Sequence, residues 1–334
     1  MKKIACTYAM RDEGMDILRE KAEIFIGNDR DPANFADKIQ DAQGVLLFRG
    51  FMNANAFDKL QHLDFVATMS VGYDHIDVES ATKYGILVLA SFGANARSVA
   101  EHTMGLLLAL DRKIVSGHYE TLAGVGWQER NPDQSFELSG RTMGIIGLGN
   151  IGKTVAKLAR AFDMNVIGYD PFLSKEATEQ AGIVYCAGYD DVLKNADVVS
   201  VHVPRSPETI NLIGKRELGL MKKSAFILNT ARGRIINEDD LADALDSGII
   251  AGAAIDVFAT EPVPPDARIL KAKNLVCTPH IAAMTKEAIR NMTVMCAKGC
   301  LAVLDGERWP AVANPEVYEQ PKWRKRLAER GGSR

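Results

Sequence analysis

A glycine-rich segment, G-L-G-N-I-G at residues 147–152, is the sequence feature that most constrains how this chain can fold. It has glycine at the three fixed positions of G-x-G-x-x-G, after an apolar, strand-like run at 143–146. The residues that follow place apolar side chains on one helical face, and the next strand-like run ends in Asp170. This strand–glycine–helix–strand–acid order predicts the first βαβ unit of a dinucleotide-binding domain.

Each position of this segment has a predicted physical role. Gly147 permits the tight turn, Gly149 lets the backbone approach a pyrophosphate, and Gly152 lets helix and strand pack closely. The backbone amides of Asn150 and Ile151, at the helix N-terminus, would face the phosphate oxygens. An ordinary glycine turn is the alternative, and the surrounding pattern argues against it.

Asp170 indicates which dinucleotide is bound. Its carboxylate would accept hydrogen bonds from a ribose diol and would repel a 2′-phosphate. Pro171, Phe172 and Leu173 follow it, so no arginine is present there to receive such a phosphate. The sequence therefore predicts NAD, rather than NADP, as the cofactor.

Strand-like and helix-compatible segments alternate along the chain, which predicts an α/β fold with parallel sheets. The later strands are apolar on both faces, as in a sheet covered by helices on both sides, and six of them suit a doubly wound nucleotide-binding domain. A helix is expected from Ser98 as N-cap, with Glu101 at the capping-box position. The predicted strands are 3–6, 44–48, 65–69, 86–89, 143–146, 165–169, 197–203, 225–229, 251–257 and 275–278.

Composition excludes several classes of function. A net charge of -3 gives no basic field for nucleic acid, and no apolar run approaches the length of a membrane span. Five scattered cysteines favour reduced thiols in a reducing compartment, and no signal peptide is expected, so a cytoplasmic location is predicted. The basic stretch at 322–326 is expected to be a solvated tail rather than a binding patch.

Polar residues follow three of the later strands. Arg232 follows 225–229, Asp256 and then Glu261 follow 251–257, and His280 follows 275–278. Because the carboxyl ends of parallel strands line the ligand crevice, these side chains are expected to converge. Taken singly, each has a plainer interpretation as a solvated or structural residue.

Cys277 lies three residues before His280, which raises the alternative of a metal site. The pair lacks further ligands at zinc-like spacing, and Cys296 and Cys300 are expected to pack as small apolar side chains, so no metal is predicted.

A series of motifs makes the pattern specific. The chain contains, in order, V-G-Y-D-H-I-D, G-L-G-N-I-G, Y-D-P, H-V-P-R-S-P-E-T, N-T-A-R-G, D-V-F-A-T-E-P and T-P-H-I-A. Over residues 40–315 this succession resembles the D-isomer-specific 2-hydroxyacid dehydrogenase family. The resemblance implies two doubly wound domains: a flavodoxin-like substrate domain at 1–98 plus 285–334, and a Rossmann NAD-binding domain at 99–284. It also implies a homodimer through the NAD-binding domain.

The resemblance further implies how the polar residues divide the chemistry. Arg232 would bind the substrate carboxylate and polarise the keto oxygen, His280 would be the general acid and base, and Glu261 would hydrogen-bond His280. Hydride delivery to a carbonyl carbon builds negative charge on oxygen, which needs a proton and a nearby cation.

Other contacts come from the same resemblance. Asp256 would contact the nicotinamide carboxamide, and Thr230 would lie against the cofactor. The amides of Val71 and Gly72 would bind the substrate carboxylate, and Arg49 would contact the far end of the substrate.

These features predict an NAD-dependent oxidoreductase that interconverts a small 2-keto acid and its D-2-hydroxy acid, with glyoxylate or hydroxypyruvate favoured as the keto acid. Phosphoglycerate oxidation and phosphite oxidation on the same scaffold are alternatives, whereas Glu261 argues against formate oxidation. An NAD-sensing corepressor is the alternative outside enzymes, and no long disordered extension supports it.

Overall fold

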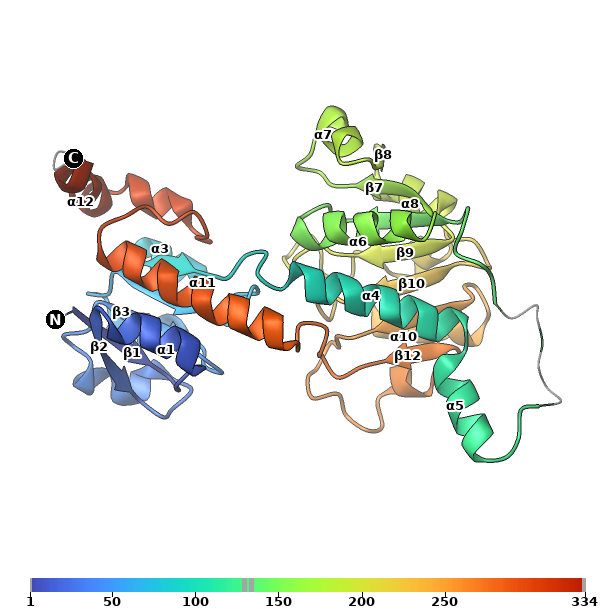
Figure 1. The fold of residues 1–334 in the computed structure, drawn as a ribbon, viewed down its shortest axis with the longest axis horizontal. Helices are drawn as coiled ribbons and strands as arrows, with labels where there is room; N and C mark the ends of the chain where they lie inside the picture. The colour runs from blue at the N-terminus through green and yellow to red at the C-terminus, as the bar shows by residue number, and fades with distance from the viewer. Residues whose placement is uncertain (1, 128–130, 132–134, 332–334) are drawn as a thin grey trace. The chain divides into compact units, whose positions relative to one another are not determined.

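The computed structural model describes residues 2–127, 131 and 135–331, and the chain divides into two compact units. Residues 1–95 and 286–334 form the first unit, and residues 96–285 form the second. Figure 1 shows the N-terminal and C-terminal segments, blue and red, building the first unit together. The sequence-based prediction placed these boundaries after residues 98 and 284.

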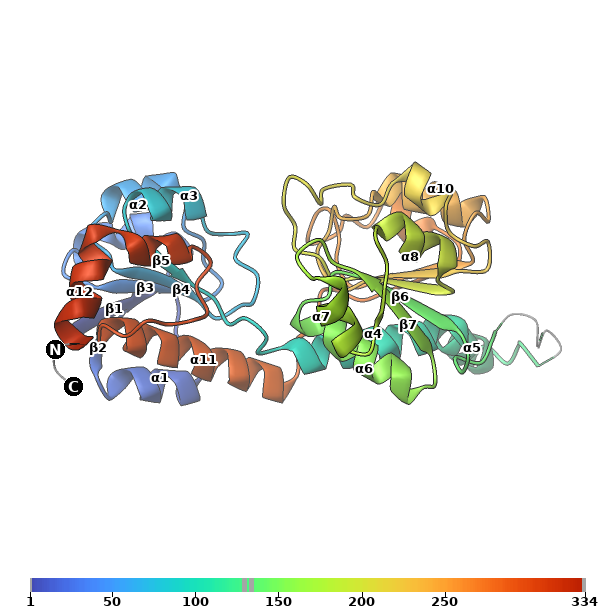
Figure 2. The ribbon, with the colours of Figure 1, turned by 90° about the horizontal axis from the view of Figure 1, so that it is seen from above.

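The first unit is built on a five-stranded parallel sheet in the order β2-β1-β3-β4-β5. Helices α1 (Asp12–Arg19) and α11 (Lys286–Leu304) cover one face, and α2 (Ala54–Lys59) and α3 (Val78–Lys83) cover the other (Figure 2). The strands are β1 (Lys2–Cys6), β2 (Ala22–Ile26), β3 (Gly44–Leu47), β4 (Phe65–Thr68) and β5 (Leu87–Leu89). β2 was not predicted, because Glu23 interrupts its short apolar run A-E-I-F-I, and three of its five residues lie half-buried at the edge of the sheet.

The basic C-terminal stretch is not a solvated tail, so that prediction was wrong. Residues 322–326 lie in α12 (Pro321–Gly331), where the Trp323 side chain is fully buried against the first unit. Nη1 of Arg326 donates to Oδ2 of Asp64 at 2.6 Å, and Nη2 donates to the carbonyls of Val303 and Leu304 at 3.1 Å. The arginine neutralises a mostly buried carboxylate and caps the end of α11, so this part of the chain is structural.

The second unit is built on a seven-stranded parallel sheet in the order β12-β11-β10-β9-β6-β7-β8. Its strands are β6 (Thr142–Ile146), β7 (Asn165–Tyr169), β8 (Val184–Tyr185), β9 (Val198–Val201), β10 (Phe226–Asn229), β11 (Gly252–Ile255) and β12 (Leu275–Cys277). β8 was missed because two residues are too short for a periodic pattern. β12 is an edge strand, so Cys277 is exposed rather than part of the packed interior.

Helices cover both faces of this sheet. One core contains side chains of α4 (Ala96–Asp111) and α6 (Asn150–Ala161), and the other contains side chains of α8 (Tyr189–Asn195) and α10 (Glu238–Asp246). The remaining helical segments are α5 (Ile114–Leu122), α7 (Lys175–Gln180), α9 (Lys215–Leu218) and the short turn Arg268–Lys271. The prediction of two doubly wound α/β domains is therefore confirmed.

The predicted start of α4 was wrong. The helix begins at Ala96, so Ser98 lies inside it, and its hydroxyl is 2.8 Å from that of Thr285 instead of capping the helix. In the described part of the chain, no helix is both long enough and apolar enough to cross a membrane.

Candidate active site

The glycine segment forms the turn between β6 and α6. Gly147 has φ +95°, a conformation that side chains rarely adopt, and a Cβ there would lie 2.8 Å from the backbone of Val203. A Cβ on Gly152 would collide with the carbonyl oxygen of Gly147, whereas a Cβ on Gly149 would meet nothing within 4 Å. Backbone contact is therefore close at the first and last glycine, and the middle glycine faces open space that a ligand can enter.

The turn lies where the strand order reverses. β7 and β8 extend the sheet on one side of β6, and β9 to β12 extend it on the other, so ligands are expected at the carboxyl ends of β6 and β9. No side chain caps the N-terminus of α6, which leaves its first-turn amides, those of Asn150 and Ile151 among them, suited to an anionic oxygen.

His202, which follows β9, was not singled out from the sequence. Nδ1 of its ring is buried and has no hydrogen-bond partner among the residues that the structure describes, and Nε2 lies 2.8 Å from the hydroxyl of Ser200. Burial lowers the pKa of His202 to about 4, so the ring is neutral at physiological pH. An unpaired polar atom beside the Gly147 turn fits a site that is completed by a polar ligand.

Asp170 lies directly after β7 and is tied to the glycine turn. Oδ2 accepts a hydrogen bond from the amide of Leu148 at 2.8 Å, and Oδ1 accepts from the amide of Phe172 at 2.9 Å. Each carboxylate oxygen keeps a further lone pair, so the predicted acceptance from a ribose diol fits this arrangement.

Sheet register brings the polar residues of the later strands to one edge. Asn229 pairs with Ile255, and Ile255 pairs with Cys277, so β10, β11 and β12 end level with one another. Arg232, Asp256 and His280 therefore follow three neighbouring strands at their carboxyl ends.

The loops after β10 and β11 are in direct contact. A Cβ on Gly233 would overlap the carbonyl of Phe258, and Nε of Arg234 donates to the carbonyl of Ala259 at 3.2 Å. Because only glycine allows this approach, the Arg232 segment is held against the segment that leads to Glu261.

His280 and Glu261 are hydrogen-bonded. Nδ1 of His280 lies 2.7 Å from Oε2 of Glu261, and Oε1 of Glu261 accepts from the amide of Phe258 at 3.0 Å. The His280 side chain is 46% exposed, so its other ring nitrogen can reach a ligand. His280 has φ 53°, a left-handed conformation that is uncommon outside glycine and that concentrates at functional sites.

Asp256 holds the loop that carries His280. The residue is fully buried, and its carboxylate accepts hydrogen bonds from the hydroxyl of Thr278 at 2.5 Å and from the amides of Ile281 and Ala282 at 2.9 Å. Its carbonyl also accepts from the amide of His280 at 2.8 Å. The direct nicotinamide contact stays a prediction, because these hydrogen bonds give Asp256 a structural role that sequence reasoning missed.

His102 of α4 completes this network. Its Nε2 lies 3.0 Å from the hydroxyl oxygen of Thr278 and 3.6 Å from Oδ1 of Asp256. Since Thr278 donates its proton to Asp256, its oxygen accepts from Nε2–H of His102. Burial raises the pKa of Asp256, but the hydrogen bonds from His102, Thr278 and the loop amides outweigh it and hold that pKa below its ordinary value.

Two other predicted residues of this unit make mainly internal contacts. The hydroxyl of Thr230 is 2.8 Å from that of Thr103 in α4, and only 5% of Thr230 is exposed. Arg232 is half-buried, and its Nη1 donates to the carbonyl of Ala231 at 2.7 Å. Contact of either side chain with a cofactor or substrate stays a prediction.

The three predicted residues of the first unit follow β3 and β4. Within the described residues, the amides of Val71 and Gly72 donate no hydrogen bond, so both can serve a ligand oxygen. Arg49 is exposed, with its guanidinium 5.3 Å from the ring centroid of Phe48. Among the residues that the structure describes, no group of three or more His, Cys, Asp or Glu side chains could hold a metal.

We expect Asp256→Asn to lower the free energy of unfolding by about 1–3 kcal/mol at pH 7, because the NH2 group of Asn replaces one carboxylate oxygen and leaves one of the two backbone amides, of Ile281 or of Ala282, facing a donor. The folded pKa of Asp256 is depressed, so this stabilisation is present above the unfolded value of about 3.9 and is lost as the pH falls through the folded value. Urea unfolding followed by circular dichroism measures the free energy of unfolding of the wild type and the variant at pH 7 and below pH 3. Asp266→Asn, at an exposed position, is the control; a destabilisation that does not shrink in acid would contradict the prediction.

Comparison with known proteins identifies the family of this chain. Residues 104–282 match the NAD-binding domain model of the D-isomer specific 2-hydroxyacid dehydrogenases. The chain is 38% identical over 96% of its length to a D-3-phosphoglycerate dehydrogenase of Methanocaldococcus jannaschii, of which it spans 61%. It is 37% identical over 95% of its length to a glyoxylate reductase of Thermofilum pendens, of which it covers 96%.

A solved structure agrees as well. The NAD-complexed D-isomer specific 2-hydroxyacid dehydrogenase of Lactobacillus delbrueckii ssp. bulgaricus has a TM-score of 0.76 at 30% identity, over 94% of this chain and 100% of that one. With its family match, its relatives and its two doubly wound sheets, the chain belongs to the D-isomer specific 2-hydroxyacid dehydrogenase family of NAD-dependent oxidoreductases.

Proposed function

We propose that this chain interconverts a small 2-keto acid and its D-2-hydroxy acid with NAD(H). The observation that carries the proposal is the hydrogen bond between Nδ1 of His280 and Oε2 of Glu261, which is 2.7 Å long. It lies at the carboxyl ends of the later strands, and Arg232 follows one of these strands, β10. Carbonyl reduction requires a proton donor and a nearby cation. An exposed imidazole that is paired with a carboxylate provides the first, and an arginine provides the second.

The residues of the chain would divide the work as follows. Bound NADH supplies the hydride. Nδ1 of His280 is engaged by Glu261, so Nε2 is the atom that delivers a proton to the developing alkoxide and removes it in the reverse direction. Glu261 stabilises the imidazolium and fixes the ring orientation.

Binding of the substrate and the cofactor completes the proposal. Arg232 neutralises the substrate carboxylate and polarises the keto oxygen, and the Val71 and Gly72 amides bind the same carboxylate. For the cofactor, the glycine turn receives the pyrophosphate, Asp170 binds the ribose, and Thr230 and Asp256 lie near the nicotinamide.

Glyoxylate or hydroxypyruvate is the first candidate for the keto acid, because the Thermofilum pendens relative, matched over nearly its whole length, is named a glyoxylate reductase. The phosphorylated counterpart of hydroxypyruvate is the second candidate, because the relative with 38% identity is named a D-3-phosphoglycerate dehydrogenase. That relative is longer, and this chain spans 61% of it.

Loss of NADH absorbance with a panel of keto acids tests the activity: glyoxylate, hydroxypyruvate, phosphohydroxypyruvate, pyruvate and a bulkier 2-keto acid. We expect turnover of at least one, and oxidation of only the D enantiomer in the reverse direction. Protein that binds NADH but turns over none of the panel, while binding a peptide partner, would support the corepressor class instead.

We expect His280→Gln to lower kcat by about a hundredfold or more, because the general acid is lost, while the Kd for NADH stays within about threefold. Stopped-flow turnover and NADH fluorescence titration measure the two quantities. His62→Gln, at an exposed position of the first unit, is the matched control. If kcat stays unchanged in the His280 variant, the histidine is not the acid.

A homodimer through the NAD-binding domain is part of the proposal. α5 has no buried residue, and it carries exposed apolar side chains on consecutive turns, with Ile114 56%, Tyr119 67% and Leu122 73% exposed. Val125 and Trp127, which follow the helix, are 53% and 65% exposed. An apolar helix face of this extent is typical of an oligomer interface.

We expect Tyr119→Glu combined with Leu122→Glu to convert a dimer into a monomer, because charge in an apolar interface is costly to desolvate. Light scattering after size-exclusion chromatography measures the mass. Phe172→Glu, at a position 91% exposed in the same unit, is the control that should remain dimeric. A wild-type protein that is monomeric at tens of micromolar would refute the dimer.

A cytoplasmic location is also proposed, on the support that all five cysteines are free thiols in the structure.

A further inference from the structure

A second carboxylate of the NAD-binding unit lies close to the pair of His280 and Glu261. Glu238 is the first residue of α10, and its side chain is half-buried. Its Oε1 accepts a hydrogen bond from the amide of Ala259, in the loop that leads from β11 to Glu261. Sequence reasoning did not single out this residue, and the proposed chemistry gives it no role.

Glu238 and Glu261 hold successive amides of the same loop. Oε1 of Glu261 accepts from the amide of Phe258 at 3.0 Å, and Oε1 of Glu238 accepts from the next amide, that of Ala259. The carbonyl of Ala259 accepts from Nε of Arg234 at 3.2 Å, so both polar groups of this residue are bonded. Glu238 therefore joins α10 to the loop that determines where the Glu261 carboxylate lies.

The carboxyl group of Glu238 also carries charge into this region. Burial raises its pKa above the ordinary value, and the like charges of Asp239 and Glu261 add to the rise. The hydrogen bond from Ala259 and the charge of Arg234 oppose it. Coupling between two sites is reciprocal, so an ionised Glu238 makes the negative charge of Glu261 more costly in turn.

Most other charges near α10 are engaged elsewhere. On the elements packed against this helix, Arg268 pairs with Asp243, Arg216 pairs with Asp190 and Glu217, and Lys215 and Lys271 are exposed. At the strand edge that carries His280, the further charged or titratable groups are those already described: Arg232, Asp256 and His102.

We infer that Glu238 is a positioning residue of the acid/base pair, which orients Glu261 through the loop and, as a second negative charge, strengthens the hold of His280 on its proton. The inference rests on the proposed function. Two neighbouring carboxylates repel each other, and a proton on His280 relieves that repulsion. The imidazolium that carbonyl reduction consumes is thereby favoured.

Glu238→Gln tests the charge, because its amide oxygen can still accept from Ala259. We expect the pKa of His280 to fall by about half a unit, as for the loss of one partly screened charge near the pair. Asp239→Asn, at the adjacent exposed position, is the matched control and should change this pKa by about 0.2 unit or less. An NMR titration measures the pKa, with the His280 signal identified by its absence in His280→Gln.

Enzyme kinetics provide a second measurement. Reduction needs the imidazolium, so kcat/KM for the keto acid falls as the pH rises through the pKa of His280. In Glu238→Gln this limb should move to lower pH by the same half unit, about the shift seen by NMR. A limb that moves equally in Asp239→Asn would contradict the inference.

Glu238→Ala tests the positioning, because it removes the acceptor as well as the charge. We expect its kcat to lie about tenfold or more below that of Glu238→Gln, since Glu261 is then less well placed. Circular dichroism shows whether both variants are folded to the same extent. Equal kcat values in the two folded variants would overturn the positioning role.

The NMR titration separates this inference from the proposed function, because it needs no substrate. If no keto acid is turned over, the proposed function fails, and a lower His280 pKa in Glu238→Gln alone still supports the role of Glu238 toward His280. If the pKa of His280 stays unchanged in Glu238→Gln, or falls equally in Asp239→Asn, the inference is overturned whatever the activity.

Discussion

The buried carboxylate of Asp256 is the contact on which the geometry of the candidate active site depends. Burying a carboxylate is costly unless its oxygens are hydrogen-bonded, and here a hydroxyl and two backbone amides serve them. All three donors belong to the segment after β12, so satisfying the charge also fixes the segment that carries His280. His102 extends the network to α4 and links the loop to the helix layer.

Backbone strain at His280 follows from this anchoring. A left-handed φ at a histidine persists only where surrounding contacts maintain it, and the amide of His280 is bound to the carbonyls of Asp256 and Thr278. The ring is thereby directed to Glu261, which a backbone bond to Phe258 holds in turn. Preorganisation of this kind lets an exposed side chain keep one orientation.

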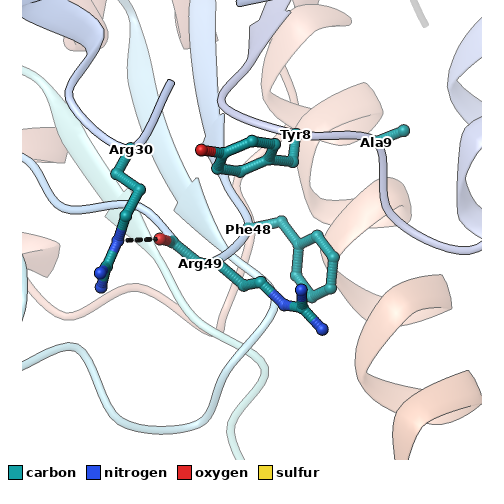
Figure 3. A pocket seen from close by; sticks show the side chains of 5 residues that line it. All are labelled: Tyr8, Ala9, Arg30, Phe48 and Arg49. Carbon is teal, nitrogen blue, oxygen red and sulfur yellow. Dashed lines mark hydrogen bonds between the residues drawn. The ribbon is translucent and has the colours of Figure 1, made fainter. Parts of the chain in front are cut away.

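The two units use the same construction with different chemistry. In each sheet the strand order reverses once beside a central strand, and the polar features follow the strands at that reversal. The second unit offers backbone amides and a carboxylate at Asp170, which suits a dinucleotide. In the first unit, Arg30 and Arg49 line a pocket together with Tyr8, Ala9 and Phe48 (Figure 3).

The sequence alone determined the features that depend on local spacing: the glycine turn, the parallel α/β fold, and the positions of Arg232, Glu261 and His280 after consecutive strands. Local spacing is sufficient to predict these features, because the backbone conformation at a glycine and the alternation of side chains in a strand are set within a few residues. Tertiary structure decided what joins distant segments: the burial of Trp323, the network of Asp256 with His102, and the meeting of Tyr8, Arg30 and Arg49. Those contacts depend on sheet order and register, which no single segment encodes.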